Sequence, residues 1–106
     1  MIDNVGYFDF NGCYGYELEP IHESVKSYYG KAVVRVDGDR ACLRSYGSRV
    51  VHVVQDASTP STDRGMFFID KGAYLSRTTL RHIREFLAQH GFGILSAAEI
   101  RRLPRI

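Results

Sequence analysis

The sequence predicts an α+β domain: a small antiparallel β-meander sheet packed on one main helix at about residues 77–90, with a short C-terminal helix. Two observations predict this fold. Short β-branched runs separated by tight turns fill residues 31–54, and apolar residues recur at helical spacing over residues 77–90. The length of 106 residues fits a single domain, 1–106, with one hydrophobic core.

The meander is expected to contain strands at residues 32–36, 40–46 and 49–54. Asp37-Gly38 predicts the first hairpin turn, because glycine accepts a positive φ, and Gly47-Ser48 predicts the second. Strict alternation of side chains then assigns the faces. Ala41 and Leu43 should lie opposite Arg40, Cys42 and Arg44, and Val50, His52 and Val54 opposite Val51 and Val53.

A polar stretch at residues 55–65 predicts a long exposed loop, and residues 66–69 a fourth strand. Before the meander, residues 21–30 fit either a short helix or an irregular lead-in to the first strand.

The main helix has a start signal, an apolar stripe and a stop signal. Ser76 is the expected N-cap, with Leu75 and Leu80 as a hydrophobic staple, and Gly91 is the expected stop. The stripe facing the core consists of Leu80, Ile83, Phe86 and Leu87. The opposite side carries Arg77, Arg81 and Arg84, with Glu85 paired to Arg81. A second helix begins at Ser96, which forms a capping box with Glu99, and ends at Pro104.

Charge is distributed unevenly along the chain. Residues 1–25 contain five acidic and no basic residues, whereas residues 26–106 contain all 14 basic residues, 11 of them arginine. Residues 1–20 are also rich in glycine and aromatic residues, so this segment should pack on a surface. Either the domain's own sheet or another chain would supply that surface, and in the second case the segment is an interaction arm.

No pattern of catalytic or metal-binding residues is evident. The four histidines lack the spacing of a zinc site, and no phosphate-binding glycine loop is present, so neither a metal nor a cofactor is expected. Cys13 and Cys42 are too few for a disulfide framework, although a single bridge between them is an alternative. His82 and Glu85 are close enough on one helix to act as an acid–base pair, but an ordinary surface contact is the preferred reading. We therefore expect a protein that is not an enzyme.

Neither a membrane-spanning run nor a signal peptide is apparent, so we expect a cytoplasmic protein without membrane contacts. An exposed edge strand of the meander would allow a second copy to pair, so both a monomer and a homodimer are compatible with the sequence.

The segment YLSRTTLRHIREFLAQHGF at residues 74–92, with SYYGKA at 27–32 and LRSYGSRVVHV at 43–53, resembles a family of small proteins carried by phages, plasmids and their Gram-positive hosts. Ser48 departs from the family pattern, which has threonine there. The resemblance covers residues 27–92 and implies an accessory protein of a mobile element, without implying a mechanism. The helical positions that match are Ser76, Thr78, Thr79, Arg81, His82, Ile83, Glu85, Phe86 and Leu87.

Binding to a macromolecule, either a protein or a ribonucleoprotein, is the function that these features favour. Tyrosine and arginine dominate the energetics of protein interfaces. We expect two contact sets, one of Tyr14, Tyr16, Glu17 and Glu19 and one of Arg77, Arg81 and Arg84. Acidic residues among aromatic ones suit a basic groove, so an inhibitor of a host defence nuclease, of the anti-CRISPR kind, is one specific hypothesis.

Direct binding of nucleic acid is the alternative. Arginines would contact phosphates, and the seven tyrosines would provide stacking surfaces for single strands. The residues expected to carry this function are Arg35, Arg40, Arg44 and Arg49.

Overall fold

The computed structural model describes residues 5–7, 13–21, 28–55, 64–90 and 95–106. Side chains are described in these ranges except at residues 5–7, 55 and 64. Three parts of the expected elements lie outside the described residues. They are residues 22–27 of the segment 21–30, expected as a short helix or an irregular lead-in, residues 56–63 of the polar loop, and the stop at Gly91.

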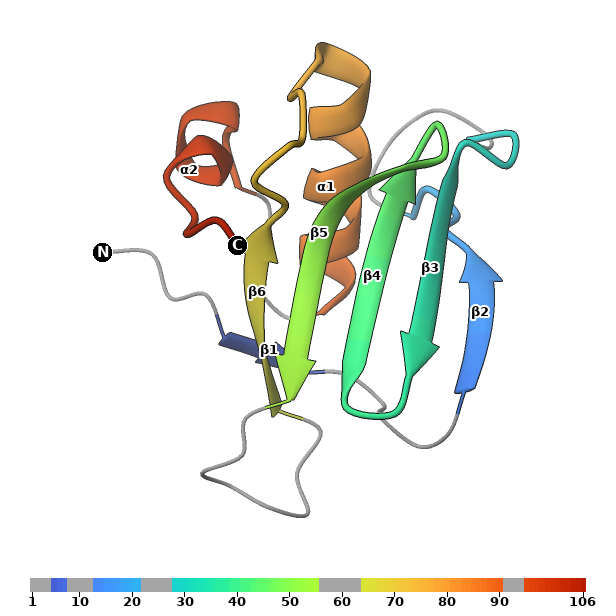
Figure 1. The fold of residues 1–106 in the computed structure, drawn as a ribbon. Helices are drawn as coiled ribbons and strands as arrows, with labels where there is room; N and C mark the ends of the chain where they lie inside the picture. The colour runs from blue at the N-terminus through green and yellow to red at the C-terminus, as the bar shows by residue number, and fades with distance from the viewer. Residues whose placement is uncertain (1–4, 8–12, 22–27, 56–63, 91–94) are drawn as a thin grey trace.

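Within these described ranges, six antiparallel strands form one sheet in the order β1-β6-β5-β4-β3-β2 (Figure 1). The strands are β1 (Val5–Tyr7), β2 (Cys13–Glu17), β3 (Ala32–Asp37), β4 (Arg40–Ser45), β5 (Ser48–Gln55) and β6 (Arg64–Ile69). From β2 to β6 each strand pairs with the next along the chain, so the predicted antiparallel meander is confirmed.

The described parts of the N-terminal segment are built into this sheet. β2 pairs with β3 along its whole length, and β1 pairs with β6 at the opposite edge. These parts therefore contact the domain's own sheet, one of the two surfaces that the sequence left open for this segment. Pairing with β1 also extends β6, which begins at Arg64 rather than at the expected residue 66.

The turns follow from backbone conformation. Gly38 has a φ of 66°, which confirms the glycine-dependent hairpin between β3 and β4. Asp37 pairs with Arg40, so the turn residues are Gly38 and Asp39, one residue later than expected. The second hairpin turns at Tyr46-Gly47, one residue earlier than expected, and Ser45 pairs with Ser48 across it. Both central residues have positive φ, 53° and 81°, as a two-residue type I′ turn requires.

A β-bulge changes the expected faces of β5. The register between β4 and β5 shifts after Leu43, which pairs with Val51, so that Arg44 pairs with Arg49. Val50 is the extra residue, and its side chain is buried. The expectation that Val50 lies on the same face as His52 and Val54 is therefore wrong, because a bulge breaks the alternation of side chains.

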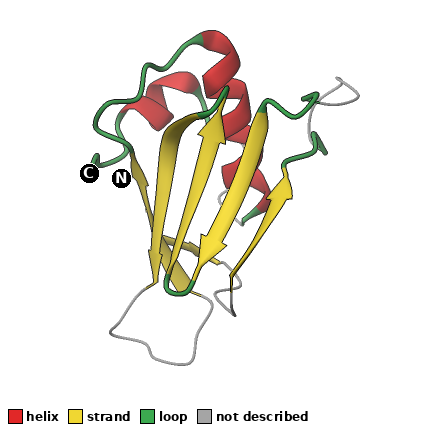
Figure 2. Cartoon of the chain, turned by 45° about the vertical axis from the view of Figure 1, so that its right-hand side comes forward, coloured by secondary structure: helices red, strands yellow, loops and turns green. Residues whose placement is uncertain are grey.

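One face of the sheet is covered by α1 (Arg77–Gln89), and α2 (Ala97–Arg101) lies beside this helix (Figures 1 and 2). The predicted caps are confirmed, since the Ser76 hydroxyl accepts a hydrogen bond from Thr79 N and Ser96 forms a capping box with Glu99. After α2 the chain returns to the sheet, where Ile69 N donates to Pro104 O at 2.8 Å and Ile106 N donates to Ile69 O at 3.0 Å.

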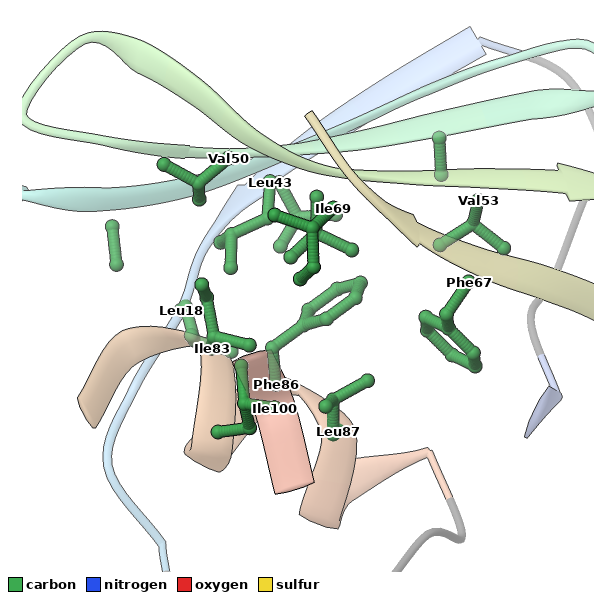
Figure 3. Packing of buried hydrophobic residues seen from close by; sticks show 14 of the residues in the cluster. Leu18, Leu43, Val50, Val53, Phe67, Ile69, Ile83, Phe86, Leu87 and Ile100 are labelled. Atoms are coloured by element: carbon green, nitrogen blue, oxygen red, sulfur yellow. The ribbon is translucent and has the colours of Figure 1, made fainter. Parts of the chain in front are cut away.

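The core fills the space between the sheet and the two helices (Figure 3). Its largest fully buried apolar side chains are Leu18, Leu43, Phe67, Ile69, Ile83, Phe86, Leu87 and Ile100. Phe67 and Phe86 meet edge to face, with ring centroids 5.7 Å apart. Such contacts add specificity to the apolar burial that holds α1 on the sheet.

Glu85 is buried within this layer, so its expected place on the arginine side of α1 is wrong. Its carboxylate accepts hydrogen bonds from Ile21 N at 2.8 Å and from Gln89 Nε2 at 2.9 Å. These bonds join α1 to the segment after β2, which supplies the partners that a buried carboxylate requires.

Candidate functional site

The face of the sheet turned away from α1 has a hollow of about 350 Å³ at its centre. All four arginines that the sequence suggested for nucleic-acid binding line this hollow, and all four are exposed. They come from three adjacent strands: Arg35 from β3, Arg40 and Arg44 from β4, and Arg49 from β5. We call Arg35, Arg40, Arg44 and Arg49 the sheet arginines.

Strand register sets the spacing of the sheet arginines. Arg44 and Arg49 are direct cross-strand partners because of the bulge, whereas Arg35 pairs with Cys42 and Arg40 with Asp37. Like charges directly opposite each other destabilise a sheet. The bulge thus creates a concentration of positive charge that the fold itself does not need.

The hollow continues toward one end of the sheet. A second hollow of about 380 Å³ shares Arg35 and Arg44 with the first and is also lined by Lys31. The Lys31 Nζ atom lies 5.6 Å from the centroid of the Tyr46 ring, a cation–π distance. Together the two hollows form a groove with five basic side chains, which we call the cationic groove.

His52 and Asp70 form a polar pair at the border of the groove. The His52 Nε2 atom is 2.6 Å from Asp70 Oδ1, and Gly72 N donates to Asp70 Oδ2 at 2.9 Å. The hydrogen bond from His52, helped by Gly72 N–H and the charge of Arg49, lowers the pKa of the Asp70 carboxyl. The pair fixes the imidazole ring in the wall of the hollow. Sequence analysis missed it, because the partners are 18 positions apart and no motif joins them.

Both cysteines are free thiols, so the alternative of a Cys13–Cys42 disulfide is wrong. Burial raises the pKa of Cys42 although the nearby charges of Arg44 and Arg49 lower it. The Cys13 thiol donates to Asp37 Oδ1 at 3.0 Å, which raises its pKa as well. A raised pKa leaves a thiol protonated at neutral pH, whereas a nucleophilic cysteine needs a thiolate.

The arginines predicted on the main helix line a separate hollow of about 300 Å³ between α1 and α2. Arg77, Arg81 and Arg84 share it with Leu80, Ala97 and Arg101. The Arg84 Nε atom donates to Leu95 O at 2.9 Å, and Arg101 Nη2 donates to Leu75 O at 3.3 Å. Two of these guanidinium groups therefore tie the chain around α2 to α1.

The four residues of the predicted N-terminal contact set differ in burial. Tyr14 and Tyr16 are half-buried and pack against the core, whereas Glu17 and Glu19 are exposed. The Tyr16 hydroxyl lies 3.4 Å from Nε2 of His90. Burial, with a contribution from Tyr14, raises the pKa of Tyr16 to about 12. The two tyrosines thus serve the core, and only the two glutamates offer exposed contacts.

A buried polar cluster joins α1 to the end of β4. The Ser45 hydroxyl is 2.8 Å from Nδ1 of His82 and 3.4 Å from the Thr79 hydroxyl. Burial lowers the pKa of His82. A serine–histidine pair at this distance is typical of hydrolases, but Ser45 and His82 are only 3% and 1% exposed, so a substrate has no access to them. The cluster explains two helical positions of the sequence resemblance, Thr79 and His82, as buried contacts of α1, and the bond of Glu85 to Ile21 N explains a third.

The described residues contain neither a cluster of metal-binding side chains nor a helix that could span a membrane. In that part of the chain, no three side chains of the metal-binding types gather to hold an ion. The helices described there are too short or too polar to cross a bilayer.

Comparison with known proteins identifies a family. The model of a family of unknown function (DUF8033) matches residues 16–102, and the chain belongs to this family. No curated protein and no solved structure matches the chain. The family match carries no activity, and the mobile-element origin implied by the sequence resemblance stays a prediction.

Proposed function

We propose that this member of the DUF8033 family binds nucleic acid through the outer face of its sheet, with the sheet arginines as phosphate contacts. The observation that carries the proposal is their convergence: four exposed arginines from three adjacent strands line one open hollow. This is the alternative that the sequence left open.

The charge arrangement supports an anionic ligand. Arg44 and Arg49 face each other across two strands, and a phosphate between them would replace their repulsion by attraction. Of the acidic side chains close by, Asp37 lines the hollow, and Asp70 is bonded to His52 and Gly72. The Glu17 carboxylate lies beside Gly30 at the Lys31 end of the groove. The groove runs on past Arg35 and Arg44 to Lys31, so it would follow a chain of phosphates rather than hold one anion.

The proposal is tested by fluorescence anisotropy with short labelled DNA and RNA, single-stranded and duplex, at two salt concentrations. Binding through phosphates releases counterions, so the affinity should fall steeply as salt rises. The variant Arg44→Gln/Arg49→Gln keeps much of each side chain and removes two charges. We expect it to weaken binding at low salt by about tenfold or more and to reduce the salt dependence.

The matched control is Arg77→Gln/Arg81→Gln, which removes the same charge from α1. This variant should bind almost as the unchanged protein does, because its arginines lie on another surface. An equal loss of affinity in both variants would show a nonspecific charge effect. If the original protein binds no oligonucleotide at low salt, the proposal is refuted.

A second candidate is the protein or ribonucleoprotein partner, with inhibition of a host defence nuclease as its specific form. The observation that favours it is the hollow between α1 and α2, where four arginines surround Leu80 and Ala97 and the described lining residues include no carboxylate. Such a surface is complementary to an acidic segment of a partner that also offers an apolar side chain.

This candidate is tested by DNA cleavage with a purified, guide-RNA-loaded nuclease in the presence of the protein. If the hollow is the contact, Arg81→Glu should abolish inhibition, whereas Arg44→Gln/Arg49→Gln should preserve it. Unchanged cleavage in the presence of the original protein would exclude this specific form.

A further inference from the structure

Two Tyr-Gly pairs adopt the same unusual backbone conformation at one end of the sheet. Tyr29 and Gly30 have φ values of 52° and 74°, and Tyr46 and Gly47 have values of 53° and 81°. Among the described residues, these tyrosines are the two positions other than glycine that have a positive φ. The left-handed conformation is rare for a bulky side chain, and turns of this kind prefer asparagine or glycine.

The two turns lie side by side. Lys31 follows Gly30 directly, and its N–H closes the first turn by donating to Tyr28 O at 2.9 Å. The carbonyl oxygen of Lys31 accepts a hydrogen bond from Tyr46 N at 2.7 Å, which joins the two turns. Figure 1 shows the hairpin between β4 and β5 at the same end of the sheet as the start of β3. The fold therefore presents the pairs as neighbours, which we call the twin Tyr-Gly turns.

Both tyrosines keep more than half of their surface exposed, although the Tyr46 ring lies 5.8 Å from the ring of His82. Tyr29 is 79% exposed and Tyr46 is 56% exposed. Backbone strain that contributes little to packing concentrates at functional sites, so an observed outlier is grounds for a functional hypothesis. The twin turns also adjoin the cationic groove, since Gly30 and Gly47 line the same hollow as Lys31 and Arg44.

We propose that Tyr29 and Tyr46 are stacking platforms for unpaired bases, so that the ligand of the cationic groove is single-stranded nucleic acid. This inference rests on the proposed nucleic-acid function and specifies its ligand. Phosphates would lie along Arg44, Arg35 and Lys31, while bases leaving the groove would meet the two rings. Every base has a π-face, so stacking tolerates any sequence, but the bases of a duplex are already stacked on each other.

The test compares single-stranded and duplex oligonucleotides of the same sequence on the variant Tyr29→Asn/Tyr46→Asn. Asparagine tolerates the left-handed conformation, so the variant should fold and should melt at or above the temperature of the original protein. We expect its single-strand affinity to fall about tenfold or more. The salt dependence should stay unchanged, because stacking releases no counterions. Tyr74→Asn is the matched control, since Tyr74 is 85% exposed but lies before α1.

Two outcomes would overturn the inference while leaving the proposed function intact. One is that the original protein binds single strands and duplexes with equal affinity, while Arg44→Gln/Arg49→Gln lowers the affinity for both. The other is unchanged single-strand binding by the double asparagine variant. If the original protein binds neither kind of oligonucleotide at low salt, the proposed function and this inference fall together.

Discussion

The two faces of the sheet differ in what their side chains do. The inner face buries Val34, Leu43 and Val53 against α1, and its buried polar side chains include the hydrogen-bonded pair of Ser45 and His82. The outer face carries the sheet arginines, all exposed. Because side chains alternate along a strand, β3 and β4 serve both faces at once.

The difference teaches that stability and the proposed binding rest on alternate residues of the same strands. On β3, Val34 and Val36 are buried and Arg35 between them is exposed. Substitutions on the inner face should therefore lower the free energy of unfolding and leave the affinity of the folded protein unchanged. Substitutions on the outer face should instead lower the affinity for the ligand and leave the free energy of unfolding nearly unchanged.

The largest expected effect is on the inner face. Phe86 is fully buried and contacts Phe67 edge to face, so Phe86→Ala removes an aromatic ring and leaves a cavity. We expect a loss of roughly 3–5 kcal/mol in the free energy of unfolding, measured by urea denaturation. A loss well below 1 kcal/mol, within the range of surface substitutions, would contradict the packing described between α1 and the sheet.

The next effect is a pH dependence on the same face. The pKa of His82 in the folded protein lies below its ordinary value of 6.5, so the unfolded chain takes up this proton first as the pH falls. The contribution of neutral His82 to stability is complete above the unfolded pKa and is lost as the pH falls toward the folded one. The loss is at most about 1.4 kcal/mol per pH unit.

The measurement is urea denaturation at about pH 7.5 and about pH 5.5, with His82→Gln as the comparison. The stability of the original protein should fall more between these two conditions than that of the variant. An equal fall in the free energy of unfolding of both proteins would assign the pH dependence to other groups and would contradict a neutral, buried His82.

The smallest expected effect is on the outer face. Arg44→Gln/Arg49→Gln removes the repulsion between cross-strand partners, so the free energy of unfolding should stay unchanged or rise by up to about 0.5 kcal/mol. Thermal and urea denaturation both measure it. A clear destabilisation would mean that these arginines help to hold the sheet, and the separation of the two faces would not stand.

Local patterns predicted most of this architecture. The apolar stripe of α1, both serine caps and the alternation of Ala41 and Leu43 with their exposed neighbours depend on residues close in sequence. The grouping of Arg35, Arg40, Arg44 and Arg49 came from their position on the predicted meander. Regular alternation would have placed Arg49 on the face of Val51 and Val53, and the bulge brings it to the hollow that the other three arginines line.

The features that sequence reasoning missed depend on contacts between distant segments. The bulge at Val50 follows from how β5 pairs with β4, and Glu85 is buried because Ile21 supplies a donor 64 positions away. The pairing of β1 with β6 and the bond between His52 and Asp70 are also non-local. The Tyr46 turn was placed one residue late, because glycine marks a positive φ and tyrosine does not.

The bulge also determines how the chain tolerates a change in length. A deletion within a regular strand reverses the facing of every residue on one side of it. Deleting Val50 would instead close the bulge, and Arg44 would still oppose Arg49 while Leu43 opposed Val51. Position 50 is thus a place where a shortened relative could lose one buried valine and keep both surfaces of its sheet.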